Sequence, residues 1–169
     1  MSKSIVTMDG GTLTVERTIS APRSKVWQAW TSKDLFEKWW GPLGWQTTVK
    51  EMDFQVGGCL HYGMKCEDEA QGDWFGKYSW GKFIYESIDA ENEFSYTDYF
   101  CDENGLVDDK MPATRAVMKF EEVETGTRII CICDMGSEEA LKQLVDMGMN
   151  EGLSQTWDRL EAMLEERSV

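Results

Sequence analysis

Apolar and polar residues alternate along much of the chain, which is the pattern of β-strands that bury one face. In the segment TRAVMKFEEV, Ala116, Met118 and Phe120 fall on one face of the expected strand, and Arg115 and Lys119 fall on the other. The same reading predicts strands at 11–20, 45–54, 59–67, 74–87, 93–101, 113–122 and 127–135.

The breaks between these strands carry residues that favour tight turns. They include Gly57-Gly58, Gly72-Asp73, Asn104-Gly105 and Thr125-Gly126. The longer polar segment DENGLVDDKMP, at 102–112, is expected to be a loop. Strands that follow one another at hairpin spacing pair with each other, so we expect a single antiparallel sheet.

Two short helices are predicted after the first strand. Pro22 suits the first turn of a helix, and Trp27 and Trp30 belong to its apolar stripe. Thr31 stands three residues before Asp34, which is a capping signature for the second helix. This helix should end at Gly41-Pro42, because proline cannot continue it.

A long amphipathic helix is predicted at the end of the chain. Ser137 is a suitable N-cap residue, and apolar residues then recur at helical spacing from Leu141 to Leu164. Gly148 and Gly152 interrupt the stripe on its inner side, where each costs on the order of 1 kcal/mol relative to alanine. Two glycines on one face indicate a need either for space or for the close approach of another group.

These elements predict a single α+β domain over residues 1–169, with a short N-terminal tail at 1–9. We find no internal repeat or linker-like segment that would divide the chain. The long helix should cover one face of a curved antiparallel sheet. A curved sheet that holds one helix leaves room between the two, so a cavity is expected there.

The charge is strongly acidic and unevenly distributed. The net charge is −14, and residues 86–169 carry all of it, with 21 acids against seven bases. Such a field repels phosphate backbones and anionic lipid head groups, which argues against nucleic-acid and membrane-surface binding. It can serve solubility alone, or it can attract a basic protein partner.

The cysteines and the only histidine indicate no metal site or cofactor. The five cysteines form no CxxC pair, and no run approaches the length of a membrane-spanning helix, so a cytoplasmic protein with free thiols is expected. His61 alternates with the inward-facing set Leu60, Tyr62 and Met64, so it should lie on the outer surface. No phosphate-binding glycine motif is present, and we expect no cofactor.

The order of elements resembles the SRPBCC superfamily, whose members share the START/Bet v 1-like, helix-grip fold. Within it the chain is similar to the family named after the C-terminal domain of the activator of Hsp90 ATPase. The segments that carry the resemblance are APRSKVWQAWTS (21–32), FEKWWGP (36–42), MDFQVGG (52–58), WGKFIYESI (80–88) and MGMNEGLSQTWDRLEAML (147–164). The resemblance implies a curved antiparallel sheet of six to seven strands wrapped around a long C-terminal helix, with two short helices after the first strand.

The function expected first is binding of a small hydrophobic or amphipathic ligand between the sheet and the C-terminal helix. Trp39 can either pack in the core or form part of the wall. The expected lining is Trp39, Tyr62, Met64, Phe83, Tyr85, Tyr96, Asp98, Met118, Phe120, Met149, Gly152 and Trp157.

Asp98 is the one candidate for catalysis. In FSYTDYF it shares a face with Tyr96 and two phenylalanines, so an inward Asp98 would lie in an apolar gap with a raised pKa. Tyr62 and Tyr85 could supply hydroxyl groups nearby. The resemblance extends to cyclase-like enzymes, so it implies a polyketide cyclase or dehydratase-like enzyme using Asp98 as an alternative, although ligand binding without catalysis is the favoured interpretation.

Two kinds of protein partner are also considered. Family members include chaperone cofactors, so an Hsp90-type chaperone is one candidate partner. Ile130 and Ile132 should lie on the outer face of the sheet, where polar residues would be expected. This feature suggests a homodimer through the sheet, unless a further helix covers that face.

Overall fold

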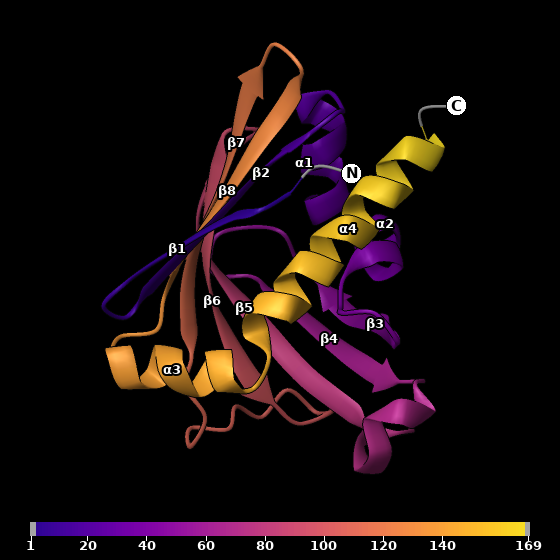
Figure 1. Cartoon of the computed structure of the whole chain (residues 1–169), viewed down its shortest axis with the longest axis vertical. Coiled ribbons are helices and arrows are strands. Elements are labelled where there is room, and N and C mark those ends of the chain that lie inside the picture. The colour runs from indigo at the N-terminus through magenta and orange to yellow at the C-terminus, as the bar shows by residue number, and fades with distance from the viewer. Residues whose placement is uncertain (1–2, 168–169) are drawn as a thin grey trace.

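The computed structural model describes residues 3–167, and its strands form one antiparallel sheet (Figure 1). The sheet order is β1-β2-β8-β7-β6-β5-β4-β3. The strands are β1 (Ile5–Asp9), β2 (Thr12–Ile19), β3 (Trp45–Met52), β4 (Cys59–Cys66), β5 (Tyr78–Asp89), β6 (Glu93–Cys101), β7 (Thr114–Val123) and β8 (Gly126–Asp134). The helix-grip α+β fold and the antiparallel pairing expected from the sequence are confirmed.

The helices gather on one face of the sheet. In Figure 1, α4 runs diagonally across that face, α1 and α2 lie behind its C-terminal half, and α3 crosses near its N-terminal end. The helices on this face are α1 (Arg23–Thr31), α2 (Lys33–Trp39), α3 (Glu138–Asp146) and α4 (Met149–Arg167), and the 3-10 helix η1 (Glu69–Trp74) lies in the connection between β4 and β5. None of these helices has the length and apolar character needed to cross a membrane.

The described sheet has eight strands, which is more than the six to seven expected. The additional strand is β1, which lies in the segment 1–9 that was expected to be a tail. Every residue of β1 is exposed, and the strand is held at the sheet edge by pairing with β2. Because backbone hydrogen bonds hold it and neither face is buried, its side chains show no alternating pattern.

The predicted C-terminal helix is divided into α3 and α4, so the expectation of one continuous helix was wrong. Gly148 has a φ of +93°, in the left-handed region that ends helices, and the N–H of Met147 closes the last turn of α3 on the carbonyl of Leu144. The predicted N-cap is confirmed, since Ser137 Oγ accepts a hydrogen bond of 3.1 Å from the N–H of Ala140. Gly148 therefore ends α3, and the chain changes direction there before α4 begins.

The cap predicted for α2 was also wrong. Thr31 is the last residue of α1, and its hydroxyl donates to the carbonyl of Trp27 at 3.1 Å. Ser32 occupies the N-cap position of α2 without a side-chain hydrogen bond. The hydroxyl of Thr31 is satisfied within its own helix, so it is not available to the next one.

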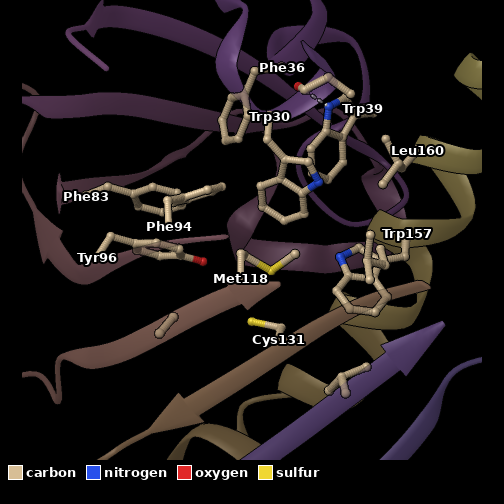
Figure 2. Close-up of a cluster of buried hydrophobic side chains, with 14 of the residues drawn as sticks. Trp30, Phe36, Trp39, Phe83, Phe94, Tyr96, Met118, Cys131, Trp157 and Leu160 are labelled. Carbon is tan, nitrogen blue, oxygen red and sulfur yellow. Dashed lines mark hydrogen bonds between the residues drawn. The ribbon is translucent and has the colours of Figure 1, made fainter. Parts of the chain in front are cut away.

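Aromatic side chains fill the space between the sheet and the first two helices (Figure 2). Trp39 is fully buried, and its Nε1 donates to the carbonyl of Ala29 at 2.9 Å. Its ring meets Trp30 edge to face, with ring centroids 4.6 Å apart. Such pairs add about 0.5–1.5 kcal/mol beyond burial, so this cluster fixes α1 and α2 on the sheet.

Ion pairs hold α4 to β2 on the same inner face of the sheet. Arg17 lies on the inner face of β2 and is only 3 % exposed. Its Nη1 donates to Asp158 at 2.8 Å and to Glu161 at 3.1 Å, both on α4. Of the two partners only Glu161 is buried, and removing one partner of a buried pair is strongly destabilising, so this contact helps to hold α4 on the sheet.

The outer face of the sheet differs from its expected form at one place. His61 does lie on that face, but it is only 7 % exposed, so its expected surface position was wrong. The loop after β6 covers it, and its Nε2 lies 3.2 Å from the carbonyl oxygen of Asp102. Ile130 and Ile132 lie on the same face and are partly buried.

Candidate functional site

A cavity of about 300 Å³ lies between the sheet and the helices α3 and α4. The sheet contributes aromatic, sulfur-containing and polar side chains, among them Tyr62, Met64, Tyr96, Asp98, Phe100, Cys131 and Cys133. The helices contribute Trp30, Leu144, Met149, Gly152, Leu153, Thr156 and Trp157. The wall is therefore mainly apolar, with few polar groups, as in small-molecule sites.

Asp98 is the one charged side chain among the described residues that line this cavity. It lies on the inner face of β6, as the alternation in FSYTDYF predicted. The hydroxyl of Tyr62, on β4, donates to its carboxylate at 3.2 Å from Oδ1 and 3.3 Å from Oδ2. The two residues form an acid–phenol pair inside the cavity.

Gly81 makes this pair possible. Tyr62 is on β4 and Asp98 is on β6, so the tyrosine must cross the intervening strand β5. It crosses at Gly81, its direct partner in the β4–β5 register. A Cβ atom at Gly81 would collide with Cζ and Oη of Tyr62. Glycine is therefore required at this position for close side-chain approach.

Burial makes Asp98 unusually basic. Desolvation raises the pKa of this carboxyl group to about 7, and the hydrogen bond from Tyr62 only partly opposes this. Burial, and next the charge of Asp98, raise the pKa of Tyr62 well above its usual value. At neutral pH, Asp98 can therefore accept or donate a proton, while Tyr62 remains a neutral donor.

Two thiols lie beside this pair on β8. The Sγ atoms of Cys131 and Cys133 are 3.4 Å apart, and both residues are buried. The hydrogen bond from Cys131, together with burial, raises the pKa of Cys133 well above its usual value. A thiol that stays protonated is a poor nucleophile, so Cys133 acts as part of the apolar wall.

An arginine from α4 fixes one rim of the cavity. Arg159 Nη1 donates to the carbonyl oxygens of Gly41 at 2.8 Å, Trp45 at 3.1 Å and Trp40 at 3.2 Å. Gly41 is itself part of the lining. The lining also reaches the surface at Met147, a residue that is 57 % exposed. One part of the rim is therefore held by the hydrogen bonds of Arg159, and another part is formed by the α3–α4 junction.

Two indole N–H groups near the wall lack an acceptor among the described residues. They are Nε1 of Trp30 and Nε1 of Trp157, and both rings line the cavity. Figure 2 shows the nitrogen-bearing edges of these rings on the sides that face one another, close to Met118. Both nitrogen atoms are buried, so they are not open to the cavity in this conformation.

The structure brings together part of the expected lining. Seven of the expected residues line the cavity: Tyr62, Met64, Tyr96, Asp98, Met149, Gly152 and Trp157. The other five are buried in the core outside the lining: Trp39, Phe83, Tyr85, Met118 and Phe120. Alternation identifies the inner face of a strand but not how far the cavity extends along it. A ligand-binding role for any of these residues remains a prediction.

Sequence reasoning missed several parts of the wall. Trp40, which follows α2, reaches the cavity although the expected lining included only its neighbour Trp39, and Trp30 belongs to both the core and the wall. Gly81 carried a usable signal, because an isolated glycine within a strand marks a close approach by another group. The position of Arg159 carried no such signal, because its partners are backbone carbonyls distant in sequence.

The described part of the chain, residues 3–167, contains no group of three or more His, Cys, Asp and Glu side chains arranged to hold a metal ion. The expectation that the protein uses no cofactor stays a prediction.

Comparison with known proteins gives a consistent result. The family model described as activator of Hsp90 ATPase homolog 1-like protein matches residues 20–165. Protein Ms6760 from Mycobacterium smegmatis has 31% identity and a TM-score of 0.81, over 95% of this chain and 97% of that chain. A protein from Arthrobacter aurescens has 30% identity and a TM-score of 0.86, over 96% of this chain and 91% of that chain. A protein from Staphylococcus epidermidis has 29% identity and a TM-score of 0.82, over 96% of this chain and 94% of that chain. No curated protein matches the sequence.

Proposed function

The chain belongs to the activator of Hsp90 ATPase homolog 1-like family, and from this premise we propose that it binds a small hydrophobic or amphipathic molecule between the sheet and α4. One observation carries the proposal. The cavity of about 300 Å³ has a mainly apolar wall with a polar pair, Asp98 and Tyr62, on one side. An apolar ligand gains roughly 25 cal/mol for each Å² that it buries, and the polar pair can orient it.

A thermal-shift screen with lipids, aromatic compounds and polyketide-like compounds tests this proposal. A binder present at 100 times its dissociation constant should raise the free energy of unfolding by about 2.7 kcal/mol. The matched variant is Gly152→Leu. A Cβ at Gly152 meets no atom closer than Pro42 Cβ at 4.0 Å, so the leucine should fit and occupy the cavity. If no compound stabilises the wild type, or if the variant responds as strongly, the proposal fails.

A second candidate function is that of a co-activator of an Hsp90-type chaperone ATPase. The family match supports it, together with three partly exposed aromatic side chains at the η1–β5 corner. These are Trp74, Phe75 and Tyr78, with exposed fractions of 51%, 49% and 46%. Exposed apolar groups of this kind are typical of protein-interaction surfaces.

An ATPase assay with an Hsp90-type chaperone tests this second function. The wild type should stimulate turnover in a salt-sensitive manner, and the double variant W74A/F75A should lose most of the effect. Val56→Ala is the control, because Val56 is 64 % exposed on another loop. A lack of stimulation at low salt, or equal stimulation by the double variant, would exclude this surface.

A third candidate is an enzyme of cyclase or dehydratase type that uses Asp98 as its acid or base. The raised pKa of Asp98 and its contact with Tyr62 support it. Turnover of a polyketide-like substrate should be lost in Asp98→Asn, and unchanged turnover in that variant would end the hypothesis.

The free thiols of the five cysteines fit the cytoplasmic location that we propose.

A further inference from the structure

We propose that the natural ligand is a hydrophobic amine, bound as its ammonium ion against Asp98 within the aromatic wall. The inference rests on the proposed ligand-binding function and assigns a chemical class to the same cavity. Three features of the structure carry it: a carboxylate without a cationic partner, rings that can face a cation, and an acidic approach to the rim.

The carboxylate has no compensating cation. Among the described residues that line the cavity there is no Lys, Arg or His. The titratable groups that face Asp98 are Tyr62 from β4, Tyr96 and Cys101 from β6 and Cys133 from β8. None of them can carry a positive charge. A buried carboxylate is costly unless it is paired, so a ligand cation would supply the missing partner.

The wall around the pair is rich in aromatic rings. Trp40 and Tyr62 meet edge to face, with centroids 5.7 Å apart, and Tyr96, Trp30 and Trp157 complete this part of the lining. The negative face of an aromatic ring attracts a cation by about 0.5–2 kcal/mol, and an anion gains nothing comparable. A neutral aliphatic wall would bury a ligand equally well but would not favour positive charge.

The surroundings of the rim are acidic. The segment 138–151, which includes α3 and the α3–α4 junction, carries four acids and one lysine. The whole chain has a net charge of −14. A field of this sign raises the local concentration of cations and lowers that of anions. Fatty acids and other anionic amphiphiles are therefore disfavoured as ligands.

Binding of an ammonium ion should be linked to proton release. Burial raises the pKa of Asp98 to about 7, while the pKa values of Tyr62, Tyr96 and Cys133 are raised well above their usual values. Of these groups, Asp98 alone changes charge near neutrality. Its ionised fraction rises from about a tenth at pH 6 to about nine tenths at pH 8, so amine affinity should rise about tenfold.

Isothermal titration with three matched probes tests the inference: 3-phenylpropylamine, 3-phenylpropan-1-ol and 3-phenylpropionate. At pH 8 we expect the amine to bind at least tenfold more tightly than the alcohol, and the carboxylate to bind least. The variant Asp98→Asn should lose the preference for the amine. Asp89→Asn, which changes an exposed carboxylate at the end of β5, should retain it.

The outcomes separate this inference from the proposed function. If the alcohol binds as tightly as the amine, or if Asp98→Asn keeps the preference, the amine inference is overturned and the cavity still binds small molecules. If none of the probes and none of the apolar compounds in the thermal-shift screen binds, both proposals fail. The pH dependence in the wild type needs no variant, and a constant amine affinity from pH 6 to pH 8 also overturns the inference.

Discussion

The chemistry of the cavity depends on three residues that are far apart in sequence. Asp98 supplies the carboxylate, Tyr62 supplies a hydroxyl group, and Gly81 leaves the gap through which the tyrosine reaches the acid. Strand alternation predicted the inward position of Asp98, and the sequence offered Tyr62 and Tyr85 as two possible hydroxyl donors near it. The structure selects Tyr62, whereas Tyr85 is buried in the core and burial raises its pKa.

Gly81→Ala should separate the acid from the phenol. The added methyl group occupies the position of the Tyr62 ring, so the ring must move away from Asp98. Overpacking of this kind typically costs about 1–3 kcal/mol in the free energy of unfolding. Chemical denaturation measures the loss, and Ser79→Ala on the same strand is the control that adds no volume. An alanine variant with wild-type stability would contradict the crossing described here.

Asp98 should also make stability depend on pH. Its pKa is about 7 in the folded protein and close to 3.8 when unfolded, so between these values the folded state holds a proton that the unfolded state has released. The free energy of unfolding should therefore fall as the pH rises from 4 to 8, by about 4 kcal/mol from this group. Denaturation of wild type and Asp98→Asn across this range isolates the contribution. Parallel curves for the two proteins would show that Asp98 is not desolvated.

At the level of elements, the rim is held on one side by α4. Arg159 contributes a single guanidinium group that satisfies several carbonyls of the segment between α2 and β3. Thr47 adds a hydrogen bond of 2.6 Å from its hydroxyl group to the carbonyl of Trp40. These contacts connect the segment after α2 to the C-terminal helix and to β3.

Arg159→Met should release this segment. Methionine keeps much of the side-chain volume but leaves the carbonyls without their donors, which costs about 1–3 kcal/mol. Amide hydrogen exchange in residues 40–45 should accelerate, while exchange in β7 and β8 stays slow. Arg128→Met is the control, because Arg128 forms ion pairs on the outer face of the sheet with Glu16 and Glu121. Unchanged amide exchange in residues 40–45 would show that Arg159 does not restrain this segment.

The elements themselves were largely predictable. Strand alternation located β2 to β8 because each of these strands buries one face, and the same rule could not find β1, which buries neither. Helical periodicity continued across Gly148, since the stripes of α3 and α4 both face the sheet. The break depends on backbone conformation, with a φ of +93°, and periodicity does not report that.

At the level of the whole molecule, the cavity exists because its two ends are built differently. Aromatic side chains from α1 and α2 fill one end of the gap, and α3 and α4 meet at an angle over the other. Sequence reasoning predicted the gap from the curved sheet and the two glycines. Its extent depends on which side chains reach across, which is why five expected lining residues belong to the core instead.

Gly152→Leu should separate folding from binding. Leucine favours a helix over glycine by up to about 1 kcal/mol, and the nearest atom to its Cβ lies 4.0 Å away, so the variant should be at least as stable as the wild type. Thermal denaturation without ligand measures this. A large loss of stability would mean that the space beside Gly152 is needed for folding.

Titration with N-phenyl-1-naphthylamine, a neutral aromatic dye that fluoresces in apolar surroundings, is the most direct test of the central claim. We expect saturable binding of one dye per wild-type chain and at least tenfold weaker binding to Gly152→Leu. Saturable binding that Gly152→Leu leaves unchanged would place the dye elsewhere, and a lack of binding to both proteins would show that the cavity does not admit a ligand.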